Sequence, residues 1–141
     1  MGKRYLTEEL RDEIMKKQRE DPELQEKLKG LTFRLLLVGT DAPGGEDRQL
    51  AINLQAGKFI SVGVTASPAP SYLRNASFDR MKFDAKVIGE HQTLFDLVSG
   101  KLDLILAFDK VQIEGDTSKL SAQLPGFIGF LEYLATMDIE P

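Results

Sequence analysis

One histidine and no cysteine limit the chemistry that this chain could perform. Any nucleophile–base pair would have to use His91, yet the sequence has no Gly-x-Ser-x-Gly motif and no serine placed to partner it. Because His91 lies between Gly89-Glu90 and a helical pattern, a capping or surface role is its simpler interpretation. Without cysteine, the chain can form no disulfide, thiolate nucleophile or cysteine-ligated zinc site. We therefore expect a protein that is not an enzyme.

The other polar motifs indicate no metal or cofactor. The acidic residues between positions 8 and 13 are typical of a solvated helix face, and the alternating acidic spacing of a calcium loop is missing. Pro43-Gly44-Gly45 and Ile88-Gly89 have neither the spacing nor the strand–helix context of a nucleotide-binding loop. We expect no bound metal and no cofactor.

Composition and charge narrow the class of protein further. A length of 141 residues predicts a single domain, residues 1–141, large enough for a hydrophobic core. A net charge of −4 argues against a nucleic-acid surface, which needs clustered Lys and Arg. The charged start of the chain is unlike a signal segment, and no apolar run approaches the roughly 20 residues that span a bilayer. We expect a cytoplasmic location.

The elements that must position any site begin with a charged helical segment, residues 1–30. Asp21-Pro22-Glu23 combines a helix cap, a proline at the first helical position and an acid in the first turn. Gly30 is a natural stop. The pattern predicts two short helices, or one kinked helix, that pack on another element.

Three strands follow, each with alternating polarity. Apolar residues recur at every second position in 31–38, 50–56 and 60–66. Ala56-Gly57 is short enough to join the last two strands in a tight hairpin. The prolines in 67–80 predict a loop after this meander.

The second half of the chain contains both strand-like alternation and helix-like spacing of its apolar residues. We expect a fourth strand over 81–87, a helix over 92–99, a very apolar helix over 102–108 and a short strand over 111–114. Asp116 or Thr117 should then cap a helix that carries Leu120 and Leu124 and ends at Pro125-Gly126. One face of a terminal helix is apolar, at Phe127, Phe130, Leu131 and Leu134. This order predicts an α+β fold with one mostly antiparallel sheet and helices covering one face.

The stretch 94–108 carries more apolar surface than one sheet can cover. It is apolar around most of a helix circumference, so it must be covered on several sides. The terminal helix, a partner subunit or a ligand could supply the cover. From composition alone, an ordinary filled core is the simpler interpretation.

The order of short motifs in this half resembles the sterol carrier protein type 2 (SCP-2, sterol transfer) family. The resemblance rests on a helix ending in Gly-Lys-Leu, an apolar helix, a short strand and a Gly-Asp that leads into a Leu-bearing helix. In this sequence these are Phe95-Asp96-Leu97-Val98-Ser99-Gly100-Lys101-Leu102, Ala107-Phe108, and Val111-Gln112-Ile113-Glu114-Gly115-Asp116 with Leu120. The strands upstream, with Asp84 on the fourth, also fit, so the resemblance covers about residues 7–135. It departs at the C-terminus, which lacks the targeting tripeptide of peroxisomal members.

The resemblance implies a five-stranded sheet, an apolar tunnel beneath its helices, and binding of fatty acids, acyl-CoA esters, sterols or similar lipids without covalent change. Transient membrane contact is compatible with this function, and the oligomeric state, monomer or homodimer, stays open. The alternative is an accessory module whose apolar groove docks a partner enzyme or a second copy of the chain. The candidate ligand-contacting residues are Leu35, Leu37, Leu50, Ile52 and Leu54 from the sheet, Leu97, Leu104, Ile105 and Phe108 from the helices, and Leu120, Leu124, Phe127, Phe130 and Leu131 at the mouth or lid.

Overall fold

The computed structural model describes residues 3–4, 8–79, 81–99, 108–135 and 139–140. In chain order the elements are β1 Lys3–Arg4, α1 Glu8–Glu20, α2 Pro22–Leu28, β2 Phe33–Ala42, β3 Glu46–Gln55, β4 Lys58–Pro68, the 3-10 turn η1 Tyr72–Arg74, β5 Ala85–Glu90, α3 His91–Val98, the 3-10 turn η2 Phe108–Lys110, β6 Val111–Gly115, α5 Thr117–Ala122, α6 Leu124–Ala135 and β7 Ile139–Glu140. The apolar helix predicted over 102–108 lies outside these residues except at its last position.

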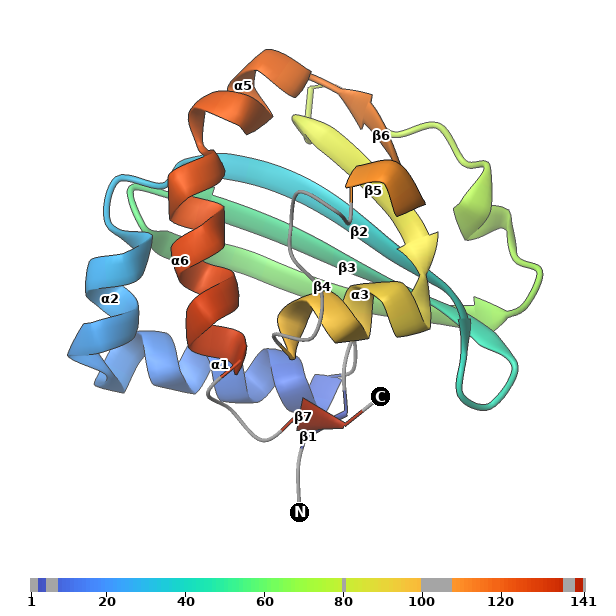
Figure 1. The fold of residues 1–141 in the computed structure, drawn as a ribbon, viewed down its shortest axis with the longest axis horizontal. Helices are drawn as coiled ribbons and strands as arrows, with labels where there is room; N and C mark the ends of the chain where they lie inside the picture. The colour runs from blue at the N-terminus through green and yellow to red at the C-terminus, as the bar shows by residue number, and fades with distance from the viewer. Residues whose placement is uncertain (1–2, 5–7, 80, 100–107, 136–138, 141) are drawn as a thin grey trace.

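One five-stranded sheet forms the middle of the fold, in the order β4-β3-β2-β5-β6. The pairs β4–β3, β3–β2 and β5–β6 are antiparallel, whereas β2 and β5 run parallel. Figure 1 shows α1, α3 and α6 on one side of this sheet, with α1 along β4 and α3 over β2 and β5. Near the two chain ends, β1 and β7 form a separate parallel pair. The mostly antiparallel sheet with helices on one face is confirmed.

The first two helices form as the sequence predicts. Asp21 adopts an extended backbone between them, and its carboxylate accepts a hydrogen bond from the Glu23 amide at 2.9 Å. Pro22 occupies the first turn of α2, where its missing amide hydrogen costs nothing. Tyr133 of α6 donates its hydroxyl to the same carboxylate at 2.5 Å, which holds α2 against α6.

The β3–β4 hairpin turns at the predicted dipeptide. Ala56 and Gly57 both have positive φ, 50° and 80°, the conformation of a tight two-residue hairpin. A Cβ on Gly57 would lie 2.7 Å from the Leu28 carbonyl oxygen, so glycine lets the hairpin pack on the end of α2.

Two predicted boundaries are wrong. The fourth strand begins at Ala85 rather than at 81, because the carbonyl of Asp79 accepts hydrogen bonds from the amides of Lys82 and Phe83 and so forms a turn. Pro125-Gly126 does not end a helix: α5 ends at Ala122, and Pro125 lies in the first turn of α6, where proline is tolerated.

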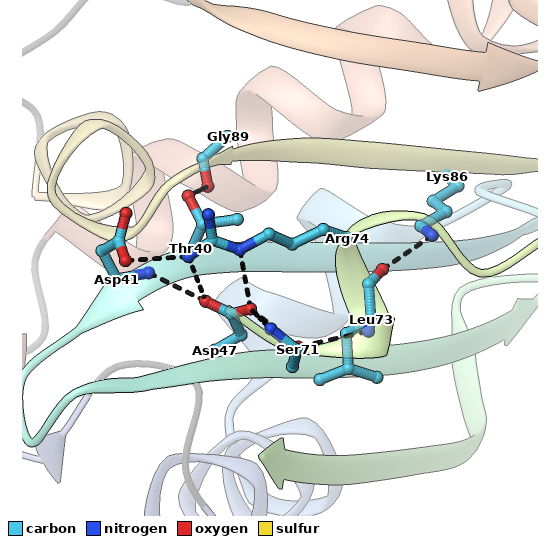
Figure 2. Close-up of polar contacts among 8 residues, drawn as sticks. All are labelled: Thr40, Asp41, Asp47, Ser71, Leu73, Arg74, Lys86 and Gly89. Carbon is cyan, nitrogen blue, oxygen red and sulfur yellow. Dashed lines mark hydrogen bonds and ion pairs between the residues drawn. The ribbon is translucent and has the colours of Figure 1, made fainter. Parts of the chain in front are cut away.

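Part of the sheet face opposite the helices is covered by a loop, residues 69–79, which we call the strap. Leu73 of the strap packs on Val38 and Ile88, whose side chains point away from the helices. The buried Lys86 ammonium donates to the carbonyl of Leu73 at 2.8 Å (Figure 2) and to the carbonyl of Ala76 at 2.7 Å.

Asp47 anchors the start of the strap to β3. Its buried carboxylate accepts hydrogen bonds from the amide and hydroxyl of Ser71, from the Arg74 guanidinium and from the Asp41 amide (Figure 2). The Arg74 guanidinium is the main cause that lowers the pKa of Asp47, with smaller contributions from the Ser71 and Asp41 hydrogen bonds. The carboxylate is therefore charged at neutral pH and fully hydrogen-bonded, a structural role.

Candidate functional site

The helix-facing side of the sheet is apolar in register across all five strands. In the middle of the sheet, cross-strand pairing aligns one side chain from each strand. We call these the central row: Val64, Leu50, Leu37, Val87 and Ile113. Because side chains alternate between faces, every residue of the central row points toward the helix layer.

One half of this face is a packed core. Leu50, Ile52 and Leu54 of β3 are 6%, 7% and 1% exposed, and they join the buried residues of α1 and α2 in one hydrophobic cluster. Phe130 of α6 closes the cluster against Phe59, with ring centroids 5.8 Å apart. The space around these side chains is filled by their neighbours.

The other half is less covered. Leu35 and Leu37 of β2 and Val87 of β5 are only half-buried, although they lie on inner strands of the sheet, and Ile113 of the edge strand β6 is half-buried beside them. Leu97 of α3 is also half-buried. Apolar side chains at the centre of a sheet face normally belong to the packed interior. We therefore place the candidate site over β2, β5 and β6.

Two further predicted residues lie at one end of this region. Leu120 of α5 and Phe127 of α6 are half-buried. Phe127 meets the ring of the buried Phe33 edge-on, with centroids 5.2 Å apart. Gly126 lets α6 begin close to the sheet, because a Cβ there would lie 3.1 Å from Leu31 Cδ1.

The structure thus brings together most of the predicted ligand-contacting residues that it describes. Leu35, Leu37, Leu97, Leu120 and Phe127 lie around the half-buried region, and Leu50, Ile52, Leu54 and Phe130 lie in the packed core beside it. Leu104 and Ile105 fall outside the described residues, as do the side chains of Phe108, Leu124 and Leu131. Sequence reasoning missed Val87, Val111 and Ile113, although their alternation with polar neighbours was the signal that could have found them.

A buried histidine and a buried arginine lie beside the central row, one row further along the strands. The next cross-strand row contains Ala66, Arg48, Gly39, Gly89 and Val111. His91 is the first residue of α3, beside this row, and is 1% exposed, so the expectation of a surface role is wrong; the N-cap position of α3 is held by Glu90 instead. Its burial, assisted by the nearby Arg48 charge, lowers the pKa of His91 to about 4. The imidazole is therefore neutral at pH 7.

A cluster of charged residues lies at the opposite end of the site. We call these residues the Asp84 cluster: Asp84, which directly precedes β5, Arg34 of β2, and Lys119 of α5. Arg34 Nη2 and Lys119 Nζ each lie 3.0 Å from a carboxylate oxygen of Asp84, and the Arg34 amide donates to it at 2.8 Å. Burial opposes ionisation of Asp84, but these hydrogen bonds outweigh it and lower its pKa. The carboxylate is held charged between two cations.

Among the described residues, no three His, Asp or Glu side chains gather in a way that could hold a metal ion. Among the described helices, none is long and apolar enough to cross a membrane. What the site presents is an apolar surface with charged groups at its two ends.

The architecture as a whole is similar to solved structures of sterol carrier protein 2. A crystal structure of that protein superposes with a TM-score of 0.64 and 14% identity, over 94% of this chain and 98% of that one. The apo form from Yarrowia lipolytica gives a TM-score of 0.50 and 15% identity, over 90% of each chain. A conserved hypothetical protein from Thermus thermophilus, described as possibly a sterol carrier protein, gives 0.70 and 14%, over 99% of this chain and 94% of its own.

No family model and no curated protein matches the sequence. The structures show that the chain has the fold of sterol carrier protein 2, which confirms the fold that the resemblance implied.

Proposed function

We propose that this protein binds and transfers lipids, such as fatty acids, acyl-CoA esters or sterols, without changing them chemically. The observation that carries the proposal is the part of the central row on β2, β5 and β6, where Leu37, Val87 and Ile113 are half-buried, together with the neighbouring half-buried Leu35. A hydrocarbon tail laid along these side chains would remove their remaining apolar surface from water. The fold shared with sterol carrier protein 2 supports the same function.

The free energy of burying a tail is sufficient for useful affinity. At about 0.8 kcal/mol per methylene, a sixteen-carbon chain gains at most about 12 kcal/mol. A micromolar Kd requires about 8 kcal/mol, which leaves about 4 kcal/mol for the costs of association and ordering. Because hydrophobic transfer is non-directional, we expect broad selectivity among tails.

The proposal assigns contact roles and no reaction. Leu97, Leu120 and Phe127 would border the ligand, and none of these side chains can transfer a proton or act as a nucleophile. The neutral His91 is buried beside Arg48 and helps to form the corner between β5 and α3. A cytoplasmic location and transient contact with membranes remain predictions.

Replacing Val87 with tryptophan tests the proposal. The indole of Val87→Trp would fill the space above the central row where the tail is expected to lie. The matched control is Ile60→Trp, because Ile60 is 55% exposed at the β4 bulge and away from the site. Displacement of a fluorescent fatty acid by palmitate measures binding, and native mass spectrometry of the purified protein detects bound lipid.

We expect wild type and Ile60→Trp to bind palmitate alike, and Val87→Trp to bind at least about tenfold more weakly while keeping its thermal unfolding temperature. Equal binding by all three would move the site elsewhere. A wild-type protein that takes up no lipid and forms an obligate dimer would instead support the docking module whose groove binds a second copy.

A further inference from the structure

The helix α5 differs from the other helices in how it is held. It joins β6 to α6 at the top of Figure 1. The structure describes all six of its residues, and none of them is fully buried. By contrast, α1 and α2 each bury two leucine or isoleucine side chains in the core. A helix without a buried apolar face has little hydrophobic stabilisation of its own.

Polar groups make the described contacts that hold α5 and its two capping residues. Lys119 Nζ lies 3.0 Å from Asp84 and 5.6 Å from the centre of the Phe33 ring. At the start of α5, the amide of Asp116 donates to the carbonyl of Asp84 at 2.8 Å, and at its end the side-chain oxygen of Gln123 accepts a hydrogen bond from the Thr32 amide at 3.1 Å. These are a partly exposed ion pair, a cation–π contact and two hydrogen bonds, each of modest strength.

The position of α5 matters because of what lies behind it. Its Leu120 and the adjacent Phe127 and Phe33 form the apolar end of the half-buried region. If α5 moved away from Asp84, this end would be uncovered while the packed core under α1 and α6 stayed intact. Asp84 itself would remain in place, because Arg34 binds it through its backbone amide and through its guanidinium.

We propose that α5 opens and closes the way by which lipid enters and leaves, and that the Lys119–Asp84 ion pair sets how often it opens. This inference rests on the proposed lipid function. The pair lies beside an exposed surface, with Lys119 34% exposed, so salt should weaken it. Lipid exchange should therefore quicken with ionic strength, although the bound tail is apolar.

The variant Lys119→Met isolates this pair. Methionine keeps an unbranched apolar stem over Phe33 and removes the charge, and Asp84 keeps its bonds to Arg34. Lys82→Met is the matched control, since Lys82 is an exposed lysine two positions from Asp84 and the change in net charge is the same. Lys119→Arg restores a cation and should restore the wild-type behaviour.

The first measurement needs no lipid. Hydrogen exchange should quicken about two- to fivefold in Lys119→Met at the amides of Leu120 and Gln123, which bond within α5 to Asp116 and Lys119. The amides of β3 should be unaffected. If the α5 amides of Lys119→Met exchange as slowly as those of the wild type, the proposal is overturned.

The second measurement is stopped-flow release of a fluorescent fatty acid at about 0.05 and 0.5 M salt. Release from wild type and Lys82→Met should quicken with salt, whereas release from Lys119→Met should already be fast and should respond less. The Kd should change less than the rate, because opening speeds both entry and exit. Faster hydrogen exchange with unchanged release would overturn the role of α5 in lipid exchange. Absence of lipid binding by the wild type would defeat the proposed function, and the hydrogen exchange would still report whether Lys119 holds α5.

Discussion

Replacing His91 with glutamine tests how the corner between β5 and α3 responds to acid. His91 is buried, and its pKa is lowered from 6.5 to about 4, first by burial and then by the charge of Arg48. In the unfolded chain the imidazole binds a proton near pH 6.5, while the folded protein resists it. The stability that depends on neutral His91 is therefore present above pH 6.5 and is lost as the pH falls toward 4.

The size of the effect follows from the shift. At about 1.4 kcal/mol per pKa unit, the full difference is about 3 kcal/mol, and about 2 kcal/mol of it is lost between pH 7 and pH 4.5. The lowered pKa values of Asp47 and Asp84 stabilise the fold above the unfolded value near 3.8, and that stability is lost only at lower pH. A comparison at pH 7 and 4.5 thus isolates the histidine.

Urea unfolding of wild type and His91→Gln at the two pH values is the assay. The wild-type free energy of unfolding should fall by about 2 kcal/mol, and that of His91→Gln should fall much less, since glutamine does not titrate. Glutamine also changes packing, so the difference between pH values, rather than the stability at one pH, is the readout. An equally steep fall in the variant would refute the reasoning.

Two further predictions concern packing on the two faces of the sheet. Gly89→Ala should lower the free energy of unfolding by about 1–3 kcal/mol, because the added Cβ would lie 2.7 Å from Val111 Cγ1. Its control, Gly63→Ala, has no atom within 4 Å of the added Cβ and should be neutral or stabilising. Thermal unfolding of the two variants measures the difference, and equal stabilities would contradict the prediction. Arg74→Met should cost about 2 kcal/mol in urea unfolding, since the buried Asp47 loses two hydrogen bonds of 2.9 and 3.0 Å; an unchanged unfolding midpoint would show that Arg74 does not hold the strap.

The meander and the first helices could be predicted because their signals are local. Alternating polarity in β2 to β4 fixes which side chains face the helices, and Asp21-Pro22 fixes where α2 begins. The hairpin at Ala56-Gly57 follows from two residues alone. Local patterns of this kind carry their own structural cause.

Features that depend on distant contacts were missed. The burial of His91 depends on tertiary packing at the corner between β5 and α3, and the charge that further lowers its pKa comes from Arg48 of β3, so nothing near position 91 in the sequence signals either. Residues 81–84 alternate in polarity like a strand, but Asp79 accepts hydrogen bonds from the amides of residues 81–83, which therefore form a turn. The parallel pairing of β2 with β5 brings Leu37 beside Val87, a pairing that no periodicity reveals.

The ligand-contacting residues predicted from the sequence overlap only in part with the candidate site that we place on the structure. Sequence reasoning put it under the apolar stretch 94–108 and over β2 and β3. The described structure fills the β3 side with the side chains of α1, α2 and α6, and leaves Val87 and Ile113 half-buried on the other side. Which half of an apolar face is packed depends on where the helices dock, and this follows from the tertiary structure.

Methyl NMR of the protein titrated with palmitate is the most direct test that a hydrocarbon tail occupies the half-buried face. We expect shifts and contacts to the ligand at the methyl groups of Leu37, Val87 and Ile113, while Val38 and Ile88 beneath the strap stay unchanged. The account would be contradicted if palmitate shifted the methyl signals of Val38 and Ile88 but not those of Leu37, Val87 and Ile113. It would also be contradicted if no methyl signal shifted.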